Sequence, residues 1–136
     1  MNLGNLTIKA AEAVQQAQQI AFNNQSANIE TEHILKSLLE QQDSPVEYLL
    51  KKNNVTVNLV ETKLDELIAK IPKATGEAAQ NVSRDANNVI LRAGAALKTF
   101  NDEFVTPEHL LLAIVQGNDN TEKLLKDAGL TEKGLI

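Results

Sequence analysis

The chain of 136 residues contains no cysteine and no tryptophan, and aromatic residues make up only 3% of it. The absence of cysteine excludes a disulfide-bonded scaffold and every zinc site built from thiolates. It also fits a reducing compartment, so we expect a cytoplasmic protein. Because aromatic rings are so few, a packed core must consist mainly of leucine, isoleucine, valine and alanine. Apolar residues amount to 43% of the chain, which is enough for such a core.

Long apolar runs, basic clusters and a signal sequence are also missing. No segment approaches the roughly 20 continuous apolar residues that cross a bilayer. The first residues do not place a charged segment before an apolar one, as a secretory signal does. The net charge is −5 and lysine and arginine do not cluster, which argues against a nucleic-acid partner. We therefore expect neither a membrane nor a nucleic acid among the partners.

The two halves of the chain are similar to each other. Residues 7–40 align without a gap with residues 83–116, at an offset of 76, and the offset becomes 75 after one residue is lost in a loop. Matched positions share polarity and helix-terminating residues, which is typical of an internal repeat. The matched positions include Ala10 with Ala86, Val14 with Ile90, Ile29 with Val105, Glu32-His33 with Glu108-His109, and Leu49-Leu50-Lys51 with Leu124-Leu125-Lys126.

Each half is predicted to contain four helices, so the expected fold class is all-α, with a pseudo-twofold tandem repeat of two four-helix units. In the first half, N-cap residues and apolar periodicity place the helices. They are a helix over 8–23 capped by Thr7, one over 31–41, one from Ser44-Pro45 to Asn53-Asn54, and one capped by Thr56 and stopped by Pro72. The first repeat is assigned to residues 1–71, a connector to 72–82 and the second repeat to 83–136, within one compact domain.

The second repeat is expected to lack most of its last helix. Thr131 corresponds to Thr56 and should cap that helix, yet the chain ends about one turn later at Ile136. We therefore expect this chain to be the N-terminal part of a longer protein. The helix that corresponds to the one from Ser44-Pro45 to Asn53-Asn54 is expected to end at Gly129. Both asparagine and glycine tolerate the left-handed conformation that often follows a helix C-terminus.

The paired units identify a family. Thr-Glu-His-Ile-Leu at 31–35 and Pro-Glu-His-Leu-Leu at 107–111 are each followed by a Leu-Leu-Lys helix and a capped turn. This order resembles the Clp N-terminal repeat, the double four-helix domain of Clp-type AAA+ unfoldases. The likeness covers essentially the whole chain. Residues 102–114 and 5–10 look most like the ClpB disaggregase branch, with the protease-feeding ClpC and ClpA branches as near relatives.

The resemblance implies a binding module tethered to an ATP-driven motor that lies beyond residue 136. Its expected partners are unfolded or aggregated polypeptides. The full-length protein is also expected to bind adaptor proteins or a partner chaperone. ATP and Mg²⁺ would belong to the motor, with no cofactor in this chain. The chain itself is expected to be a monomer and the full-length protein a homohexamer. An adaptor-docking domain of a ClpC- or ClpA-type unfoldase is the alternative, and a scaffold that regulates its own motor is another.

The residues also argue against chemistry within the chain. The spacing nearest to a phosphate-binding loop runs from Gly129 to Gly134, but Leu135 stands where lysine is required. Glu30 and His33 have the i, i+3 spacing of a helical di-metal site, but Thr106 replaces the acid in the second repeat. Each histidine is instead expected to bond backbone near a helix cap or to pack on the sister helix. We therefore predict no catalytic residues and no metal ligands.

Candidate binding residues are apolar side chains that the helical stripes leave unexplained. Ile8 lies opposite the buried face of the first helix, Ala11 lies on its flank, and Leu91 lies off the corresponding stripe in the second repeat. Phe104 and Leu112 are apolar where the first repeat has Asn28 and Lys36. These residues either line an apolar groove for exposed segments of misfolded chains or fill the interface between the halves.

Three polar residues are candidates by resemblance. Thr7, Asp102 and Glu108 match positions that the family associates with the substrate-handling surface. Each also has a local explanation, because Thr7 caps a helix, Asp102 lies in a turn and Glu108 favours a helix N-terminus. Glu32 and Glu108 are repeat-related acids, and matching acids in ClpC-like domains resemble receptors for positively charged or phospho-arginine marks.

Overall fold

The structure is a computed structural model that describes residues 5–74, 81–100 and 102–135. The elements of the first repeat are α1 (Ile8–Asn23), β1 (Asn28–Ile29), α2 (Thr31–Glu40), α3 (Pro45–Lys52) and α4 (Val57–Ala69). The segment assigned as the connector ends with β2 (Asn81–Val82). The second repeat contains α5 (Arg84–Phe100), α6 (Pro107–Val115), α7 (Asn120–Asp127) and a 3₁₀ turn, η1 (Lys133–Leu135). The predicted all-α class is therefore confirmed.

The helices begin where their capping residues predicted. The Thr7 hydroxyl accepts a hydrogen bond from the Ala10 N–H at 3.1 Å, and Ser83 accepts one from the Ala86 N–H at the same distance. These matched bonds satisfy donors that a helix N-terminus otherwise leaves unpaired. Thr56 occupies the N-cap position of α4, but its side chain makes no capping bond.

The helix C-termini and the chain end also follow the sequence, with one correction. Asn54 and Gly129 have φ values of 62° and 105°, the left-handed conformation expected after α3 and α7. The residues after Thr131 form the 3₁₀ turn η1 instead of the start of an α-helix. The Thr131 hydroxyl accepts a bond from the Gly134 N–H at 3.1 Å, so this turn closes locally.

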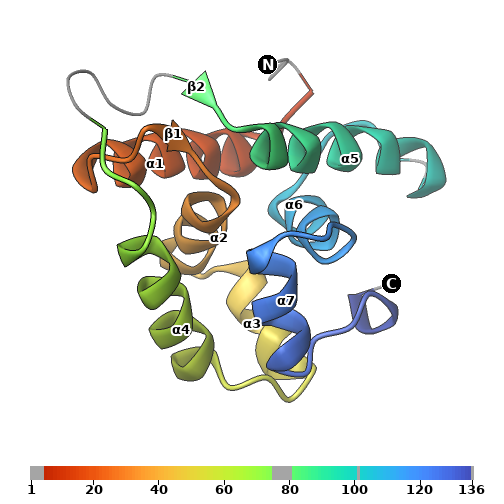
Figure 1. The fold of residues 1–136 in the computed structure, drawn as a ribbon. Coiled ribbons are helices and arrows are strands. Elements are labelled where there is room, and N and C mark those ends of the chain that lie inside the picture. The colour runs from red at the N-terminus through yellow and green to blue at the C-terminus, as the bar shows by residue number, and fades with distance from the viewer. Residues whose placement is uncertain (1–4, 75–80, 101, 136) are drawn as a thin grey trace.

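The helices are arranged about a pseudo-twofold axis. In Figure 1, α1 and α5 lie along one side of the molecule, α2 and α6 pack beneath them, and α3, α4 and α7 form the opposite side. The core is continuous across both repeats and consists of aliphatic side chains. Alanines at matched positions, Ala10 with Ala86 and Ala17 with Ala93, are completely buried and let neighbouring helices approach closely.

Two short parallel pairings cross between the repeats. Leu6 of the first repeat pairs with Val105 of the second, and Val82, directly before the second repeat, pairs with Ile29 of the first. The two pairings are related by the 76-residue offset. The Thr7 N–H donates to the Val105 carbonyl at 2.9 Å and the Ser83 N–H donates to the Ile29 carbonyl at 2.9 Å. Each repeat therefore begins on the surface of the other, a feature that the sequence did not predict.

The segment assigned as a connector contacts the first repeat at both of its described ends. Ala74 donates its N–H to the Gln25 carbonyl at 2.7 Å, and β2 pairs with β1. The remainder of that prediction, residues 75–80, lies outside the described residues. Of the helices that the structure describes, none is long and apolar enough to cross a membrane.

Candidate functional site

Two exposed apolar side chains border the pairing of Leu6 with Val105 in the sequence, and a third lies on α5. Ile8 follows it directly on α1 and is 81% exposed, while Phe104 precedes Val105 and is 50% exposed. Leu91 on α5 is 62% exposed. It lies one turn before Gly94, where a Cβ atom would be 3.7 Å from Nδ2 of Asn5. We call Ile8, Leu91 and Phe104 the Ile8 surface.

The pseudo-twofold axis provides a comparison surface within the same molecule. The residues matched to Ile8, Leu91 and Phe104 are Arg84, Gln15 and Asn28. Arg84 and Asn28 border the equivalent pairing of Val82 with Ile29 in the sequence, and Gln15 lies on α1; we call these three residues the sister surface. The same backbone arrangement therefore carries apolar side chains on one side of the pseudo-twofold axis and polar side chains on the other side. Folding of the pairing itself does not require the apolar set.

The remaining candidates lie in different surroundings. Thr7 caps α1 and pairs with Val105, so it borders the Ile8 surface, and Ala11 is partly buried one turn farther along α1. Glu108 is exposed in the first turn of α6. The structure corrects the prediction for Leu112, which is only 4% exposed. From Leu110 to Val115 every residue of α6 is apolar and buried, so Leu112 does not line an accessible groove.

Asp102 belongs to a hydrogen-bonded unit at the start of α6. The Thr106 N–H donates to Nδ1 of His109 at 2.9 Å, and Nε2 of His109 lies 2.9 Å from Oδ2 of Asp102. The first repeat has the matched unit, in which the Glu30 N–H donates to Nδ1 of His33 at 2.9 Å. Both histidines therefore bond backbone at a helix cap, as the sequence predicted.

The contacts among Asp102, His109 and Thr106 do not activate the Thr106 hydroxyl as a nucleophile. Oγ1 of Thr106 lies 3.1 Å from Nδ1 of His109, but the lone pair of Nδ1 already accepts the Thr106 N–H. The same hydroxyl caps the His109 N–H at 3.3 Å. A general base needs a free lone pair toward its nucleophile, and this histidine presents none there. Within the described residues, no cluster of three or more acidic or histidine side chains could hold a metal ion.

An acidic hollow of about 280 Å³ lies at the seam between the repeats. Its charged lining consists of Glu30, Glu32, Asp85, Asp119 and Lys70. Burial raises the pKa of Glu32 above its usual value, and the negative charges of Glu30 and Asp119 raise it further. The ionised form of Glu32 is therefore disfavoured in the folded state.

Replacing Glu32 with glutamine is expected to stabilise the fold at pH 7, because it removes a charge that burial and the neighbouring acids disfavour. A raised pKa in the folded state means that wild-type stability falls as pH rises through the range just above 4.5. The advantage of the variant should accordingly shrink as pH is lowered toward 4.5. Urea unfolding at several pH values measures it, with Glu108→Gln, at the matched exposed position, as the control. A destabilised Glu32→Gln protein at pH 7 would contradict the expectation.

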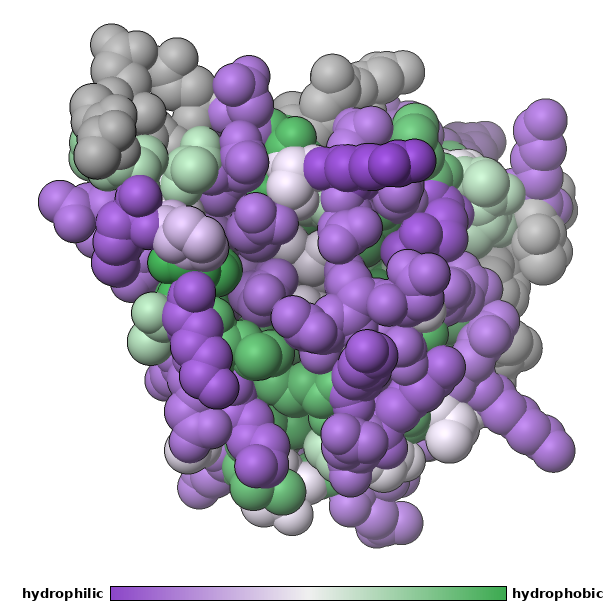
Figure 2. All heavy atoms as spheres, viewed as in Figure 1, coloured by the Kyte–Doolittle hydropathy of each residue, from purple (hydrophilic) through white to green (hydrophobic). Residues whose placement is uncertain are grey.

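A second hollow runs between α4 and α7. Leu67 and Leu124 line it, with Lys63, Lys70 and Lys123 among the polar residues around them. Figure 2 shows apolar surface exposed along this part of the molecule. The hollow does not include any of the predicted site residues.

Comparison with known proteins places the chain in a family. The Clp repeat (R) N-terminal domain matches residues 5–128. The chaperone protein ClpB of Porphyromonas gingivalis is 35% identical over 133 residues, covering 98% of this chain and 15% of the relative. ClpB of Bacteroides thetaiotaomicron is 35% identical over 135 residues, covering 99% of this chain and 16% of the relative. The chain thus spans a small part of the length of these relatives.

Solved structures have the same fold. The Hsp104 N-terminal domain from Candida albicans superposes with a TM-score of 0.81 at 20% identity, covering 96% of this chain and 86% of that one. The N-terminal domain of the ClpV1 ATPase from E. coli gives 0.82 at 21% identity, covering 98% and 82%. The family model that matches residues 5–128 and the identity to the ClpB relatives show that the chain belongs to the Clp N-terminal repeat domain family.

Proposed function

We propose that this chain is the substrate-binding N-terminal module of an ATP-dependent, ClpB-type disaggregase. In this proposal the Ile8 surface engages exposed apolar segments of unfolded or aggregated proteins in the cytoplasm. The ATPase motor, its ATP and Mg²⁺, and a hexameric assembly belong to the full-length protein. The sequence identity to two ClpB chaperones supports the choice of branch.

The difference between the Ile8 surface and the sister surface is the observation that carries this proposal. Both include residues that border the same type of crossed pairing, so the fold accepts Arg84, Gln15 and Asn28 where the other surface has apolar side chains. Exposed apolar residues that gather at one place are typical of interaction sites. Burial of apolar area requires little directional matching, which suits a site for many different sequences.

Replacing Ile8 and Leu91 together with serine is expected to weaken binding of an unfolded protein such as reduced, carboxymethylated lactalbumin about thirtyfold. Each side chain can contribute about 1 kcal/mol when it is buried against a bound segment, and about 1.4 kcal/mol corresponds to a factor of ten. Isothermal titration calorimetry measures the affinity. Chemical-shift changes around Ile8, Ala11 and Leu91 in the wild-type chain locate the contact.

The matched control replaces Phe22, near the other end of α1, and Leu59 on α4, which are 60% and 46% exposed, with serine. Its affinity should equal that of the wild type. If both pairs of substitutions weaken lactalbumin binding equally, the assignment of the binding site to the Ile8 surface is wrong. Tight binding of a folded adaptor, with no competition from unfolded protein, would favour the ClpC- or ClpA-type alternative.

A further inference from the structure

The loop between α5 and α6 carries Phe104 of the Ile8 surface between two anchored residues. Before it, the N–H of Asp102 donates to the Leu97 carbonyl of α5 at 2.9 Å. After it, the N–H and the carbonyl of Val105 both bond the segment that precedes α1. Glu103 and Phe104 lie between these anchors and are exposed. The direction in which Phe104 projects therefore depends on how firmly the two anchors are held.

A side-chain hydrogen bond also fixes Asp102 to α6. The Thr106 N–H donates to Nδ1 of His109 at 2.9 Å, so in the neutral ring the proton is on Nε2. Nε2 then donates to Oδ2 of Asp102, which lies 2.9 Å away. His109 is buried, while the side chain of Asp102 is 47% exposed. Asp102 thus binds a ring inside the fold with one carboxylate oxygen and closes the loop onto the helix that follows.

The first repeat makes the same contact with an uncharged acceptor. Ser26 matches Asp102, and its hydroxyl lies 3.2 Å from Nε2 of His33, whose Nδ1 likewise accepts a backbone N–H. Ser26 is only 1% exposed, and Lys73 forms an antiparallel bridge with it. An ionised carboxylate buried there would lose its hydration, whereas the exposed Asp102 keeps it. Both repeats therefore place an acceptor for the ring N–H at this position, and its exposure decides whether the acceptor can be charged.

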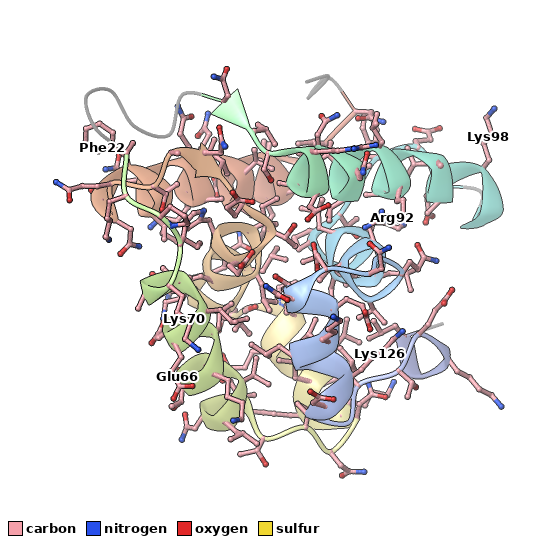
Figure 3. The ribbon with its side chains drawn as sticks, in the orientation of Figure 1. Phe22, Glu66, Lys70, Arg92, Lys98 and Lys126 are labelled. Carbon is pink, nitrogen blue, oxygen red and sulfur yellow. The ribbon has the colours of Figure 1, made fainter. Side chains whose placement is uncertain are left out.

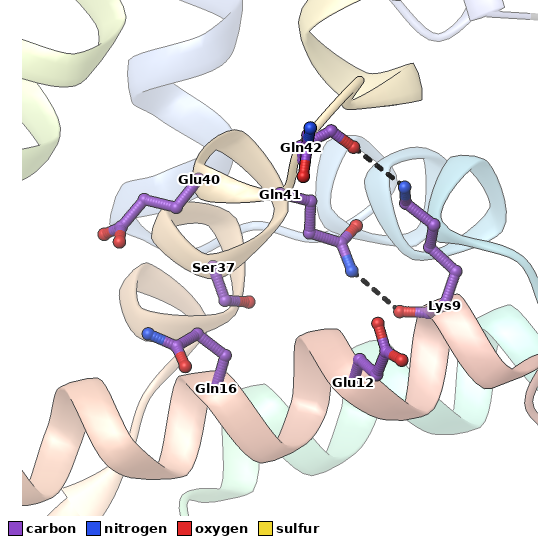
Figure 4. A pocket seen from close by; sticks show the side chains of 7 residues that line it. All are labelled: Lys9, Glu12, Gln16, Ser37, Glu40, Gln41 and Gln42. Carbon is purple, nitrogen blue, oxygen red and sulfur yellow. Dashed lines mark hydrogen bonds between the residues drawn. The ribbon is translucent and has the colours of Figure 1, made fainter.

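Each helix pair is also joined at a second place, away from its histidine. In the second repeat, Nε of Arg92 donates to the Ala113 carbonyl at 3.0 Å, and Figure 3 shows Arg92 extending from α5 toward α6. In the first repeat, Nε2 of Gln41 donates to the Lys9 carbonyl at 2.8 Å, which joins α2 to α1 (Figure 4). Loss of the Asp102 carboxylate is therefore expected to loosen the loop while α5 and α6 stay packed.

We infer that Asp102 is a positioning residue of the Ile8 surface, which holds Phe104 in place for bound apolar segments through its hydrogen bond with His109. This role rests on the proposed function of that surface. A direct contact of Asp102 with a basic side chain of the substrate is the alternative. Positioning requires only a hydrogen-bond acceptor at residue 102, whereas contact with a cation requires the negative charge.

Substitutions at Asp102 separate the two roles. Asp102→Ala removes the acceptor and is expected to weaken binding of carboxymethylated lactalbumin at least about threefold, because Phe104 is no longer held. Asp102→Asn keeps an acceptor without the charge, and Asp102→Ser copies Ser26, so both should bind as the wild type does. Glu103→Ala removes the neighbouring exposed charge and should also bind as the wild type does. Equal losses in Asp102→Asn and Asp102→Ala would overturn the inference.

A double-mutant cycle tests whether Asp102 acts through Phe104. Phe104→Ser is expected to weaken lactalbumin binding about fivefold, because the exposed half of the ring is lost as a contact. If Asp102 acts through this ring, Asp102→Ala should cause no further loss in the Phe104→Ser protein. Additive losses would show that Asp102 contacts the substrate itself and would refute the positioning role.

The loop geometry can be measured without a substrate. The ¹⁵N shifts of the neutral His109 ring should report a proton on Nε2, and a proton on Nδ1 would contradict the bond with Asp102. Asp102→Ala should lower the heteronuclear NOE values of the Glu103 and Phe104 amides, and Asp102→Asn should restore them. Unchanged values in Asp102→Ala would refute the inference even if binding falls.

The two proposals fail separately. If the Ile8→Ser, Leu91→Ser protein binds lactalbumin as the wild type does, the apolar capture function is wrong, while the NOE values still show whether Asp102 holds Phe104. If those substitutions weaken binding but Asp102→Asn behaves as Asp102→Ala does, only the positioning role is wrong.

Discussion

Replacing Leu35 with alanine is expected to lower the free energy of unfolding by about 3 kcal/mol, and replacing Leu111 should lower it by a similar amount. The two leucines occupy matched positions on α2 and α6, at the centre of the molecule, and both are completely buried. Truncation removes the transfer free energy of the side chain and leaves a cavity in a close-packed core. Because the two repeats share one core, each substitution is expected to lower the stability of both halves together.

Urea unfolding monitored by circular dichroism measures both losses, provided that the denaturant dependence is unchanged. Leu59→Ala is the control, since Leu59 is 46% exposed on α4 and its truncation should change stability by less than about 0.5 kcal/mol. Two separate unfolding transitions in either variant, with one repeat melting alone, would contradict the single shared core. So would a difference of several kcal/mol between the two matched substitutions.

The fold could be predicted because each signal was local. The hydroxyls of Thr7 and Ser83 bond their own helices, and the alanine stripe needs only the helical period. The crossed pairings could not be predicted. A two-residue strand has no periodicity, and the pairing of Leu6 with Val105 depends on how the repeats dock.

The residues of the candidate site were also predicted only in part. Ile8, Leu91 and Phe104 were predicted from their departure from the helical stripe or from the sister repeat, and all three are exposed. Leu112 was misassigned because only its difference from Lys36 was considered. Lys36 pairs with Asp65 of α4 at 2.9 Å, whereas the run from Leu110 to Val115 on α6 consists of apolar residues that are all buried. That run was the available signal of full burial.

Acidification is expected to destabilise the wild-type chain more than a His33→Gln variant. His33 is completely buried, and desolvation lowers its pKa from 6.5 to about 4. In the folded state Nδ1 accepts the Glu30 N–H and Nε2 lies 3.2 Å from the Ser26 hydroxyl, so the neutral ring is the form that fits. Glutamine at this position can accept the same N–H, as in a capping box, and does not titrate.

The pKa shift sets the direction and the size of this effect. Between pH 6.5 and 4 the unfolded state binds a proton at His33 that the folded state does not, so stability falls as pH is lowered through this range. A difference of 2.5 pKa units corresponds to about 3 kcal/mol. The free energy of unfolding of the wild type should therefore drop relative to His33→Gln by about this amount between pH 7 and pH 4.

Urea unfolding of both proteins across that range measures the difference, in which contributions from other titrating groups cancel. The variant is expected to be the less stable protein at pH 7, because it loses the contact with Ser26 and part of the ring's packing, and to overtake the wild type as pH falls. An NMR titration of the His33 ring gives an independent value of the folded-state pKa. Parallel pH profiles for the two proteins, or a ring that titrates near 6.5 while the chain is folded, would contradict the assignment of His33 as a buried neutral histidine.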